Sequence, residues 1–224
     1  MKHLLKKDIE GATFGRIIAD ATSVKMKGFD FDFIKPYELV DLGIGTLWMD
    51  RNIGAASPED AGLYFAWGET KGYTAEQCGT GEGQRTFTAD NHQFTDTPEV
   101  LPAENDAATA FDPELRMPTM AEVEALWRLR WDEVYSSDGS DRVFLGVRFN
   151  GTNGNTLFVP AAGRCVGGAI EGSDTHSFLW SSSTYPGYPQ YTVSSHYDNI
   201  SHSSGVSYNA ASFNGCPVRG VVGK

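Results

Sequence analysis

The 224-residue chain has only three cysteines, which lie far apart and form no Cys-x-x-Cys pattern. A zinc cluster needs closely spaced ligands, and a dense disulfide framework needs an even number of cysteines at short intervals. The sequence therefore indicates neither kind of site. Cys78, Cys165 and Cys216 are expected to remain thiols, with at least one of them buried.

Lysine and arginine are also scarce: 18 of them stand against 29 aspartates and glutamates, which gives a formal charge of -11. A protein that binds nucleic acid or an anionic membrane through charge needs a basic face to displace counterions. We therefore expect no nucleic-acid partner. Solubility is a sufficient explanation of the acidic charge.

Long apolar runs are missing as well. No segment reaches the roughly 20 apolar residues that span a membrane, so no membrane insertion is expected. The basic N-terminal residues are not followed by an apolar run of signal-peptide length, which predicts synthesis without a Sec signal. A phage particle, the cytoplasm, and the cell surface reached by another route all stay open as locations.

The hydrophobic content of 40%, with 12% aromatic residues, is enough for a substantial core. We expect one main domain over residues 39–224. Residues 1–38 alternate short apolar stretches with charges, a pattern more typical of strands than of a helix. Two interpretations of them stay open: an attachment arm, or the first strands of the domain.

Two helix starts are indicated. Thr119 and Glu122 have the spacing of a capping box, and apolar residues then recur at three- and four-residue intervals. Residues 57–60, Ser-Pro-Glu-Asp, combine a capping hydroxyl, a proline at the first helical position and acids in the first turn. A short helix is therefore predicted there too.

The rest of the chain favours strands. Residues 142–149 and 156–160 alternate with period two around an Asn-Gly-rich turn, which predicts a hairpin. Further strands are expected at residues 64–68, 177–182 and 217–222. Residues 70–112 are rich in Gly, Thr, Asp and Glu and predict a long loop. Few helices among many short strands indicate an α+β domain.

Residues 181–215 have an unusual composition. Of these 35 residues, ten are Ser, five Tyr, three Asn, two His and one Asp, and none is Lys or Arg. Tyrosine offers a large flat contact with a hydroxyl at its tip, while Ser and Asn form adaptable hydrogen bonds. The segment is therefore predicted to be a recognition surface, with strands at 191–194 and 200–203 and a turn at 195–199. A hydroxyl-rich loop or sheet face is the alternative.

Seven short motifs stand in order between residues 40 and 222. They are Val40-Asp41-Leu42-Gly43 with Trp48, Tyr64-Phe65-Ala66-Trp67-Gly68-Glu69, Asp106-Ala107-Ala108, Arg116-Met117-Pro118-Thr119, Leu157-Phe158-Val159-Pro160-Ala161-Ala162-Gly163, Trp180-Ser181-Ser182-Ser183 and Val218-Arg219. In this order they resemble the Fibrobacter-type paralogous domain and the variable proteins of diversity-generating retroelements. Both are related to the C-type lectin and formylglycine-generating-enzyme fold. One departure is the ending, where the family usually reads Ser-Val-Arg-Pro and this chain has Gly220 after Arg219.

The resemblance implies a C-type-lectin-like domain whose C-terminal strands and loops display ligand-binding residues on a fixed scaffold. In the retroelement proteins, adenines of a template repeat are randomised, and an AAC codon changed at its two adenines can give Asn, Ser, Tyr, His or Asp but never a stop. Those residue types are the ones enriched in residues 181–215. The implied ligand-contacting positions are Tyr185, Tyr188, Tyr191, His196, Tyr197, Asp198, His202, Tyr208 and Asn209.

Metal and cofactor chemistry is not indicated. Calcium-dependent lectins bind sugars through acidic or amide triplets around a proline, or through Trp-Asn-Asp, and residues 176–216 contain neither. A structural cation near Glu104, Asn105 and Asp106 is an open alternative to a solvated acidic loop. We expect no metal and no cofactor.

Enzyme chemistry is not indicated either. Cys165 and Cys216 could be imagined as the cysteine pair of a formylglycine-generating enzyme. Ser194 or Ser195 with His196 and Asp198 would suit a hydrolase, but adjacent residues on a strand point to opposite faces. His92 and His176 are interpreted as ordinary loop residues. The chain is therefore predicted not to be an enzyme.

The predicted function is recognition of a protein or glycan surface by a variable, ligand-binding protein of a phage, prophage or gut-type bacterium. Two alternatives stay open: a fixed-specificity adhesin or structural domain of the same fold, and a cysteine oxidase resembling the formylglycine-generating enzymes.

Overall fold

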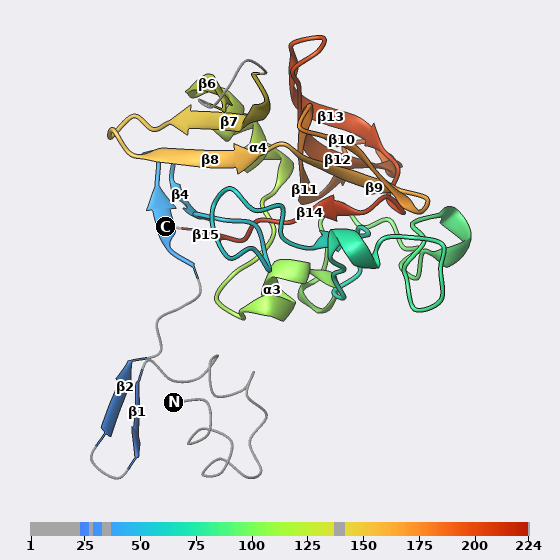
Figure 1. The fold of residues 1–224 in the computed structure, drawn as a ribbon, viewed down its shortest axis with the longest axis horizontal. Helices are drawn as coiled ribbons and strands as arrows, with labels where there is room; N and C mark the ends of the chain where they lie inside the picture. The colour runs from blue at the N-terminus through green and yellow to red at the C-terminus, as the bar shows by residue number, and fades with distance from the viewer. Residues whose placement is uncertain (1–22, 27–28, 33–36, 137–141, 224) are drawn as a thin grey trace. The chain divides into compact units, whose positions relative to one another are not determined.

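A computed structural model describes residues 23–26, 29–32, 37–136 and 142–223 (Figure 1). The chain divides into two compact units, residues 1–36 and 37–224. In the first unit, strands β1 (Ser23–Met26) and β2 (Phe29–Asp32) pair in antiparallel register, with Ser23 opposite Asp32.

The second unit is mixed, with few helices and many strands in small sheets, which confirms the α+β class. Its strands are β3 (Leu39–Asp41), β4 (Thr46–Met49), β5 (Tyr64–Phe65), β6 (Arg130–Tyr135), β7 (Phe144–Asn150), β8 (Thr156–Pro160), β9 (Ala162–Val166), β10 (Ala169–Ser173), β11 (His176–Tyr185), β12 (Tyr188–Asp198), β13 (Ser203–Ala210), β14 (Cys216–Pro217) and β15 (Val221–Gly223). Its helices are α3 (Ala107–Phe111), α4 (Met120–Trp127) and the 3-10 helices η1 (Ala75–Gln77), η2 (Ala89–Asn91) and η3 (Ala103–Asn105). Within the described part of the chain, none of these helices is long and apolar enough to cross a membrane.

The first and last strands of this unit lie in one sheet, in the order β15-β4-β3. Val221 pairs with Trp48 of β4, and its backbone also exchanges two hydrogen bonds with Arg116, of 2.8 and 3.1 Å. The predicted strand at 217–222 is therefore interrupted. It consists of β14 and β15, and the residues between them pair with the chain that follows β4. For example, the Val218 carbonyl accepts a hydrogen bond from the Ile53 N–H at 2.9 Å.

Arg219, between β14 and β15, is fully buried and explains the interruption. Its Nε and Nη2 donate to Asn52 Oδ1 at 3.1 and 2.9 Å, and its Nη1 donates to the Phe158 carbonyl at 2.6 Å. Burial lowers the pKa of Arg219 to about 9. The Val-Arg motif near the C-terminus is thus structural, because it ties the last segment to two earlier ones.

Helix α4 begins as predicted. Thr119 and Glu122 form the capping box, with the Thr119 N–H donating to Glu122 Oε2 at 2.8 Å. Val123 and Leu126 are buried in one apolar cluster with residues of β7 and β8 and of β11 and β12. Figure 1 shows α4 between the β6–β7–β8 sheet and the β11–β12–β13 sheet. The helix therefore joins the two larger sheets.

The hairpin of β7 and β8 is confirmed, with Asn150 opposite Thr156. Its turn rests on the residues after β3, because the Thr152 N–H donates to the Leu42 carbonyl at 3.0 Å and Asn155 Nδ2 donates to the Asp41 carbonyl at 2.9 Å. The buried apolar face of the hairpin and these hydrogen bonds from its turn together hold the register of β7 and β8.

The helix predicted from residues 57–60 is wrong. These residues form a turn, closed by the Asp60 N–H on the Ser57 carbonyl at 3.2 Å and the Ser57 N–H on Asp60 Oδ2 at 2.9 Å. The chain must then return at once, since Gly62 has φ +73° and the Leu63 N–H bonds the Ile53 carbonyl. The pairing of Leu63 with Ile53 leaves no room for a helical turn, so tertiary contacts override the local helix-start pattern.

Residues 70–112 form the predicted long excursion, which carries η1, η2, η3 and α3 and pairs with the other segments that the structure describes only through isolated bridges such as Phe87 with Gly167. The strand predicted at 64–68 is shorter than expected, because only Tyr64 and Phe65 pair and Gly68 already has φ +79°. Beyond that glycine the chain leaves the sheet and enters the excursion.

Candidate functional site

The sheet of β11, β12 and β13 carries the segment predicted to bind ligand, and β12 is its central strand. His196 pairs with Phe178 of β11 and with Gly205 of β13. Strand β12 continues to Asp198, so the turn predicted at residues 195–199 is wrong. Pairing on both sides keeps these polar residues extended despite their turn-like composition.

The turn between β12 and β13 lies at residues 199–202, so the strand predicted at 200–203 is wrong, because β13 begins only at Ser203. The Asp198 carboxylate accepts from the Ile200 N–H at 2.8 Å and from Ser201 Oγ at 2.5 Å, and these bonds lower the pKa of Asp198. His202 has φ 54°. Asp198, predicted as a ligand contact, is therefore committed to shaping the turn.

A Pro-Gly turn joins β11 to β12 at the other end of the sheet. The ring of Pro186 fixes its own φ at about −65°. Gly187 has φ 80°, and this combination is the one that a type II turn requires. Tyr185 pairs with Tyr188 directly across the turn, whereas the next pair is Thr184 with Thr192. The intervening bulge in β12 adds Tyr191 to the same end of the hairpin.

Four tyrosines, Tyr185, Tyr188, Tyr191 and Tyr208, form what we term the tyrosine row. The ring of Tyr185 stacks on Tyr188, with centroids 5.6 Å apart, and contacts Tyr208 of β13 at 4.8 Å. Tyr188 and Tyr191 lie 6.4 Å apart. The sequence-predicted positions at this end of the sheet are therefore brought into one continuous group of rings.

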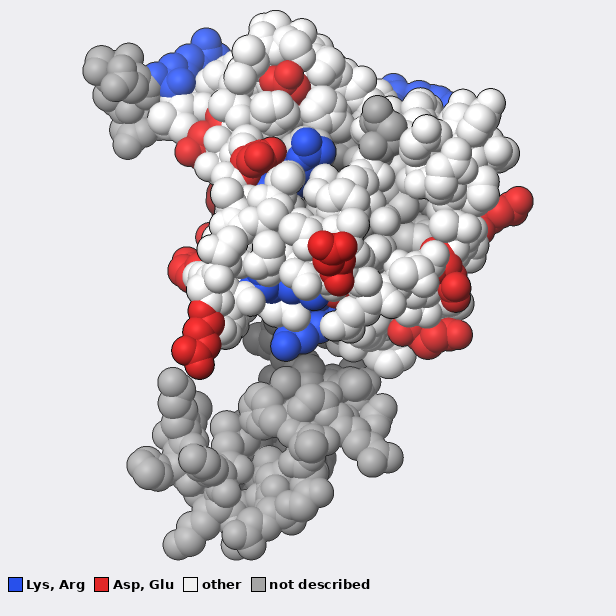
Figure 2. Space-filling view, turned by 90° about the vertical axis from the view of Figure 1, so that its right-hand side faces the viewer, with Lys and Arg blue, Asp and Glu red and all other residues white. Residues whose placement is uncertain are grey.

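The tyrosine row faces solvent. Tyr188 is 54% exposed, Tyr191 43% and Tyr208 40%, while Tyr185 is partly buried beneath its neighbours. Partial burial, and beyond it the charge of Glu124, raises the pKa of Tyr208. The face of the molecule seen in Figure 2 consists mostly of uncharged side chains, with acidic and basic groups scattered among them.

A groove of about 240 Å³ adjoins the tyrosine row. Pro189 and Gln190 of the β12 bulge line one part of it, and Phe94 and Asp96 of the long excursion line another. Sequence reasoning did not assign Phe94 or Asp96 to the site. The available signal was the length of the excursion, since loops of more than about 15 residues within a domain are often functional.

Tyr197 is not part of the exposed surface, and this corrects its predicted ligand-contacting role. Its side chain is 0% exposed and packs against Trp127, Trp131 and Phe144, with ring centroids 6.2, 5.3 and 5.5 Å away. Its hydroxyl donates to Glu133, and burial raises the pKa of Tyr197. Strand alternation turns it toward α4 and β6, away from the face of its neighbour His196.

His202 is exposed, as a ligand contact should be, but it also has an internal partner. Its Nδ1 lies 3.0 Å from Glu133 Oε1. Glu133 Oε2 accepts from the Tyr135 hydroxyl at 2.8 Å, and the hydrogen bond from Tyr197 is the main reason that the pKa of Glu133 is lowered. Glu133 therefore fastens the β12–β13 turn to β6.

His196 lies in a second cluster, at the end of the sheet opposite the tyrosine row. Its ring contacts Phe178 at 5.0 Å and His176 at 5.8 Å, and His176 Nε2 lies 3.5 Å from Asp198 Oδ1. Burial, followed by the nearby His176, lowers the pKa of His196. His196 and Asp198 are thus brought together with each other and not with the tyrosine row. Asn209 belongs to β13, and its side chain lies outside the described part of the structure.

The arrangement offers no hydrolytic group at the candidate serines. Ser194 and Ser195 are buried, and Ser195 Oγ accepts from Trp127 Nε1 at 2.9 Å. His196 points to the face of β12 opposite Ser195, as strand alternation requires, and Ser194, which shares the face of His196, is only 1% exposed. His92 is held by the Trp67 carbonyl, 2.8 Å from its Nε2.

Asp106, considered as a cation ligand, has a structural role. It caps α3 by accepting from the Ala108 and Thr109 N–H groups at 2.8 and 3.0 Å, and it accepts from the Met117 N–H at 2.8 Å. Asn105 Nδ2 donates to the Gly68 carbonyl. Over residues 37–136 and 142–223, no cluster of three or more His, Cys, Asp or Glu side chains is arranged to hold a metal ion.

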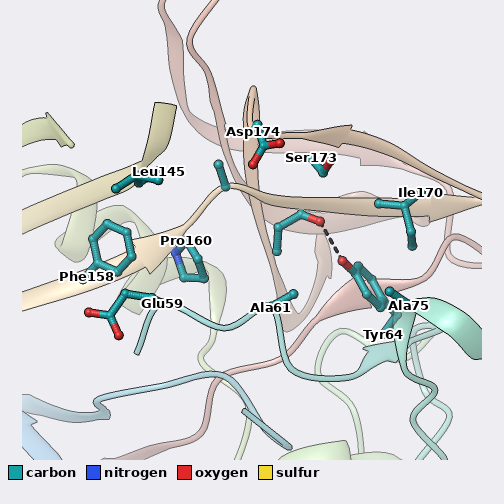
Figure 3. A pocket seen from close by; sticks show the side chains of 12 residues that line it. Glu59, Ala61, Tyr64, Ala75, Leu145, Phe158, Pro160, Ile170, Ser173 and Asp174 are labelled. Atoms are coloured by element: carbon teal, nitrogen blue, oxygen red, sulfur yellow. Dashed lines mark hydrogen bonds between the residues drawn. The ribbon is translucent and has the colours of Figure 1, made fainter. Parts of the chain in front are cut away.

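A second hollow of about 400 Å³ lies away from the predicted site residues (Figure 3). Leu145, Phe158 and Ile170 give it apolar walls, and the Tyr64 hydroxyl donates to the Ala162 carbonyl at 2.7 Å within it. Glu59, Ser173 and Asp174 are the other polar side chains that line it.

Comparison of the chain with protein-family models, with curated proteins and with solved structures gives no match.

Proposed function

We propose that the chain is a ligand-binding protein that holds a protein or glycan surface through the tyrosine row, presented on a C-type-lectin-like scaffold. The observation that carries the proposal is the row itself. Four rings in mutual contact stand at one end of two long paired strands, and three of them are 40% exposed or more. The proposal includes no enzymatic step.

The physical reason is the small loss of side-chain conformational entropy when these rings bind a ligand. Each tyrosine has only two side-chain torsions to restrict, and rings already packed on one another lose little freedom when a ligand arrives. The absence of Lys and Arg from residues 181–215 leaves stacking and hydroxyl hydrogen bonds as the main source of affinity. Binding should therefore depend only weakly on salt concentration.

Support for the scaffold comes from the buried residues of the sequence motifs. Trp67 Nε1 donates to the Ser181 carbonyl and Trp180 Nε1 donates to the Phe65 carbonyl, both at 2.8 Å. Arg219 links the last segment to Asn52 and Phe158. Motif residues that hold distant segments together are what a fixed frame beneath a variable surface requires.

Diversification by a retroelement is part of the proposal at the exposed positions. Tyr188, Tyr191 and Tyr208 can change without opening the core, because each is exposed. Surface substitutions of this kind usually change stability by less than about 0.5 kcal/mol. A variable protein needs such tolerance.

A fixed-specificity adhesin of the same fold is the second candidate, and Tyr197 and Asp198 favour it. Tyr197 belongs to the core and Asp198 shapes a turn. Randomising either position would damage the fold, so only part of the enriched segment suits diversification.

The neighbouring DNA separates the two candidates. Retroelement diversification predicts a near-copy of the sequence encoding about residues 180–219 that differs only where the copy has adenine. The differences should fall at exposed positions such as Tyr188 and Tyr191 and spare Tyr197. Genomic DNA flanking the gene that holds no such copy would support fixed specificity.

Substitution tests the binding surface directly. An array of immobilised glycans and bacterial surface proteins first identifies the probe that the unaltered chain binds best. The triple variant Tyr188→Ala, Tyr191→Ala, Tyr208→Ala should bind that probe at least tenfold more weakly. Its melting temperature should change by less than about 2 °C, because the three rings are exposed.

The matched control removes exposed apolar side chains elsewhere: Leu39→Ala, Val143→Ala, Leu145→Ala. These three residues are 38 to 40% exposed and lie outside residues 181–215, so binding should persist. Equal binding by the tyrosine variant, or an equal loss in the control, would exclude the tyrosine row as the contact surface.

A further inference from the structure

The molecule contains a pair of neighbouring thiols that the proposed function does not use. Cys78, after η1 in the long excursion, and Cys165, in β9, lie in one buried cluster with Tyr64 and Phe87. Cys165 is 0% exposed and Cys78 is 8% exposed. Their 87-residue separation means that only the folded chain brings them together.

The backbone around the pair is held on both sides. The N–H groups of Phe87 and Gly167 donate to each other's carbonyls, at 2.7 and 3.0 Å. A Cβ added at Gly168 would meet Gly79 and Thr80 at 3.0 Å or less, so the turn after β9 lies directly against the residues after Cys78. These contacts fix the excursion against β9 at the level of the thiols.

The third cysteine is placed differently. Cys216 pairs with Phe65 and packs in the cluster that contains Trp67 and Trp180. Arg164, next to Cys165 in the sequence, lies over the Phe178 ring, 5.1 Å from its centroid. Cys165 pairs with Gly215, so strand alternation turns the next side chain, that of Cys216, to the other face. The fold therefore places Cys165 in one apolar cluster with Cys78, whereas Cys216, which the sequence suggested as its partner, packs in another.

We propose that Cys78 and Cys165 are a redox modification site, at which a small peroxide converts the two thiols into a disulfide that a thiol reductant reverses. The excursion would then be covalently joined to β9. Because Phe94 and Asp96 of the same excursion line the groove beside the tyrosine row, the bond would also restrict one wall of that groove.

The chemistry assigns different tasks to the two sulfurs. The neighbouring Cys165 thiol lowers the pKa of Cys78, while the Cys78 thiol and burial raise the pKa of Cys165. The Cys78 thiolate attacks one peroxide oxygen and becomes a sulfenic acid, with hydroxide leaving. That hydroxide takes the Cys165 proton, and the resulting thiolate attacks the Cys78 sulfur and releases a second hydroxide, which takes up the proton lost by Cys78. Two thiols and one hydrogen peroxide thus give one disulfide and two waters.

The test treats the full chain with hydrogen peroxide, unfolds it in denaturant and counts free thiols, followed by non-reducing peptide mapping. The expected result is a fall from three thiols to one, a peptide pair joining Cys78 to Cys165, and return of three thiols after dithiothreitol. The melting temperature of the oxidised form should rise by on the order of 5 °C, since the bond closes a long loop.

Three variants complete the experiment. Cys216→Ser should still lose two thiols, whereas Cys78→Ser and Cys165→Ser should each form no intramolecular bond. Retention of three thiols in the oxidised wild type, a bond that involves Cys216, or over-oxidation of Cys78 without pairing would each overturn the proposal. None of these outcomes depends on ligand binding, so they leave the proposed function to its own test.

Discussion

Tyr188 and Tyr197 lie nine residues apart on the same strand and have opposite roles. Tyr188 is 54% exposed at the bulged end of β12, whereas Tyr197 is 0% exposed in the regular part, under α4. Composition treats the two rings alike. Only the position of the bulge and the parity of the strand decide which one faces solvent.

This difference predicts different costs of substitution. Tyr197→Ala should destabilise the fold by about 3–5 kcal/mol, because it removes a fully packed aromatic ring. Tyr197→Phe should cost about 1–2 kcal/mol, since it removes only the hydrogen bond to Glu133. Tyr188→Ala should stay within about 0.5 kcal/mol of wild type. Urea unfolding measures all three, and a Tyr197→Ala variant as stable as Tyr188→Ala would contradict the packing described for Tyr197.

Residues whose roles depend on sequence neighbours were predicted well, and those whose roles depend on distant partners were not. The Thr119–Glu122 capping box is a local interaction and is confirmed. Asp106, considered as a cation ligand, instead depends on Met117, eleven residues away. Asp198 is an exception, because its partners Ile200 and Ser201 are local, but its residue type fitted the enriched segment and it was predicted as a ligand contact.

Helix α4 owes its stability to one carboxylate as much as to its apolar face. Glu122 accepts from Arg116 through two bonds of 2.6 and 2.7 Å and from Thr46 Oγ1 at 3.1 Å, besides closing the capping box. Burial alone would raise the pKa of Glu122, but the bonds from Arg116 and Thr119 outweigh it and lower the pKa to about 2.

A carboxylate with a lowered pKa stabilises the fold above its unfolded pKa, and that stability is lost as the pH falls through the folded value. The stability that ionised Glu122 contributes should therefore be lost as the pH falls from 4.5 to about 2. Glu122→Gln keeps a side-chain oxygen for the capping box but cannot ionise. It should be less stable than wild type at pH 7 by on the order of 2 kcal/mol, with the difference vanishing near pH 2.

The control for this prediction is Glu124→Gln on the same helix. Glu124 pairs with Arg128, which is 75% exposed, at 3.2 Å, and surface pairs of this kind contribute only about 0.3–0.5 kcal/mol. Urea unfolding at several pH values measures both variants. A stability difference for Glu122→Gln that stays constant from pH 7 to pH 2 would show that ionisation of Glu122 is not the cause.

At the level of elements, strands that alternate in the sequence and pair with their neighbours were predicted, as for β7 and β8. The ends of elements were missed where distant backbone decides them. β12 runs through residues 195–198 because β11 and β13 both bond it. The turn at residues 57–60 does not become a helix because the next residues must reach β5.

The whole molecule consists of two compact units, and the role of the first is a separate question from the fold of the second. Residues 1–36 contain the paired strands β1 and β2, and residues 37–224 contain the larger mixed domain, whose β3 and β15 lie on either side of β4. The strand pairs that join the beginning and the end of the larger unit therefore lie within that unit.

Deletion of residues 1–36 should therefore leave the larger unit folded. We expect residues 37–224 alone to melt within about 2 °C of the full chain, and nitration with tetranitromethane to modify Tyr188, Tyr191 and Tyr208 much faster than Tyr64 and Tyr197, which are at most 2% exposed. Scanning calorimetry and mass spectrometry measure the two properties. If the deletion instead lowers the melting temperature by 10 °C or more, or exposes Tyr197 to nitration, residues 1–36 supply strands that the domain needs. If the fragment is unchanged, neither the fold nor the recognition surface depends on residues 1–36, and this result would favour their role as an attachment segment.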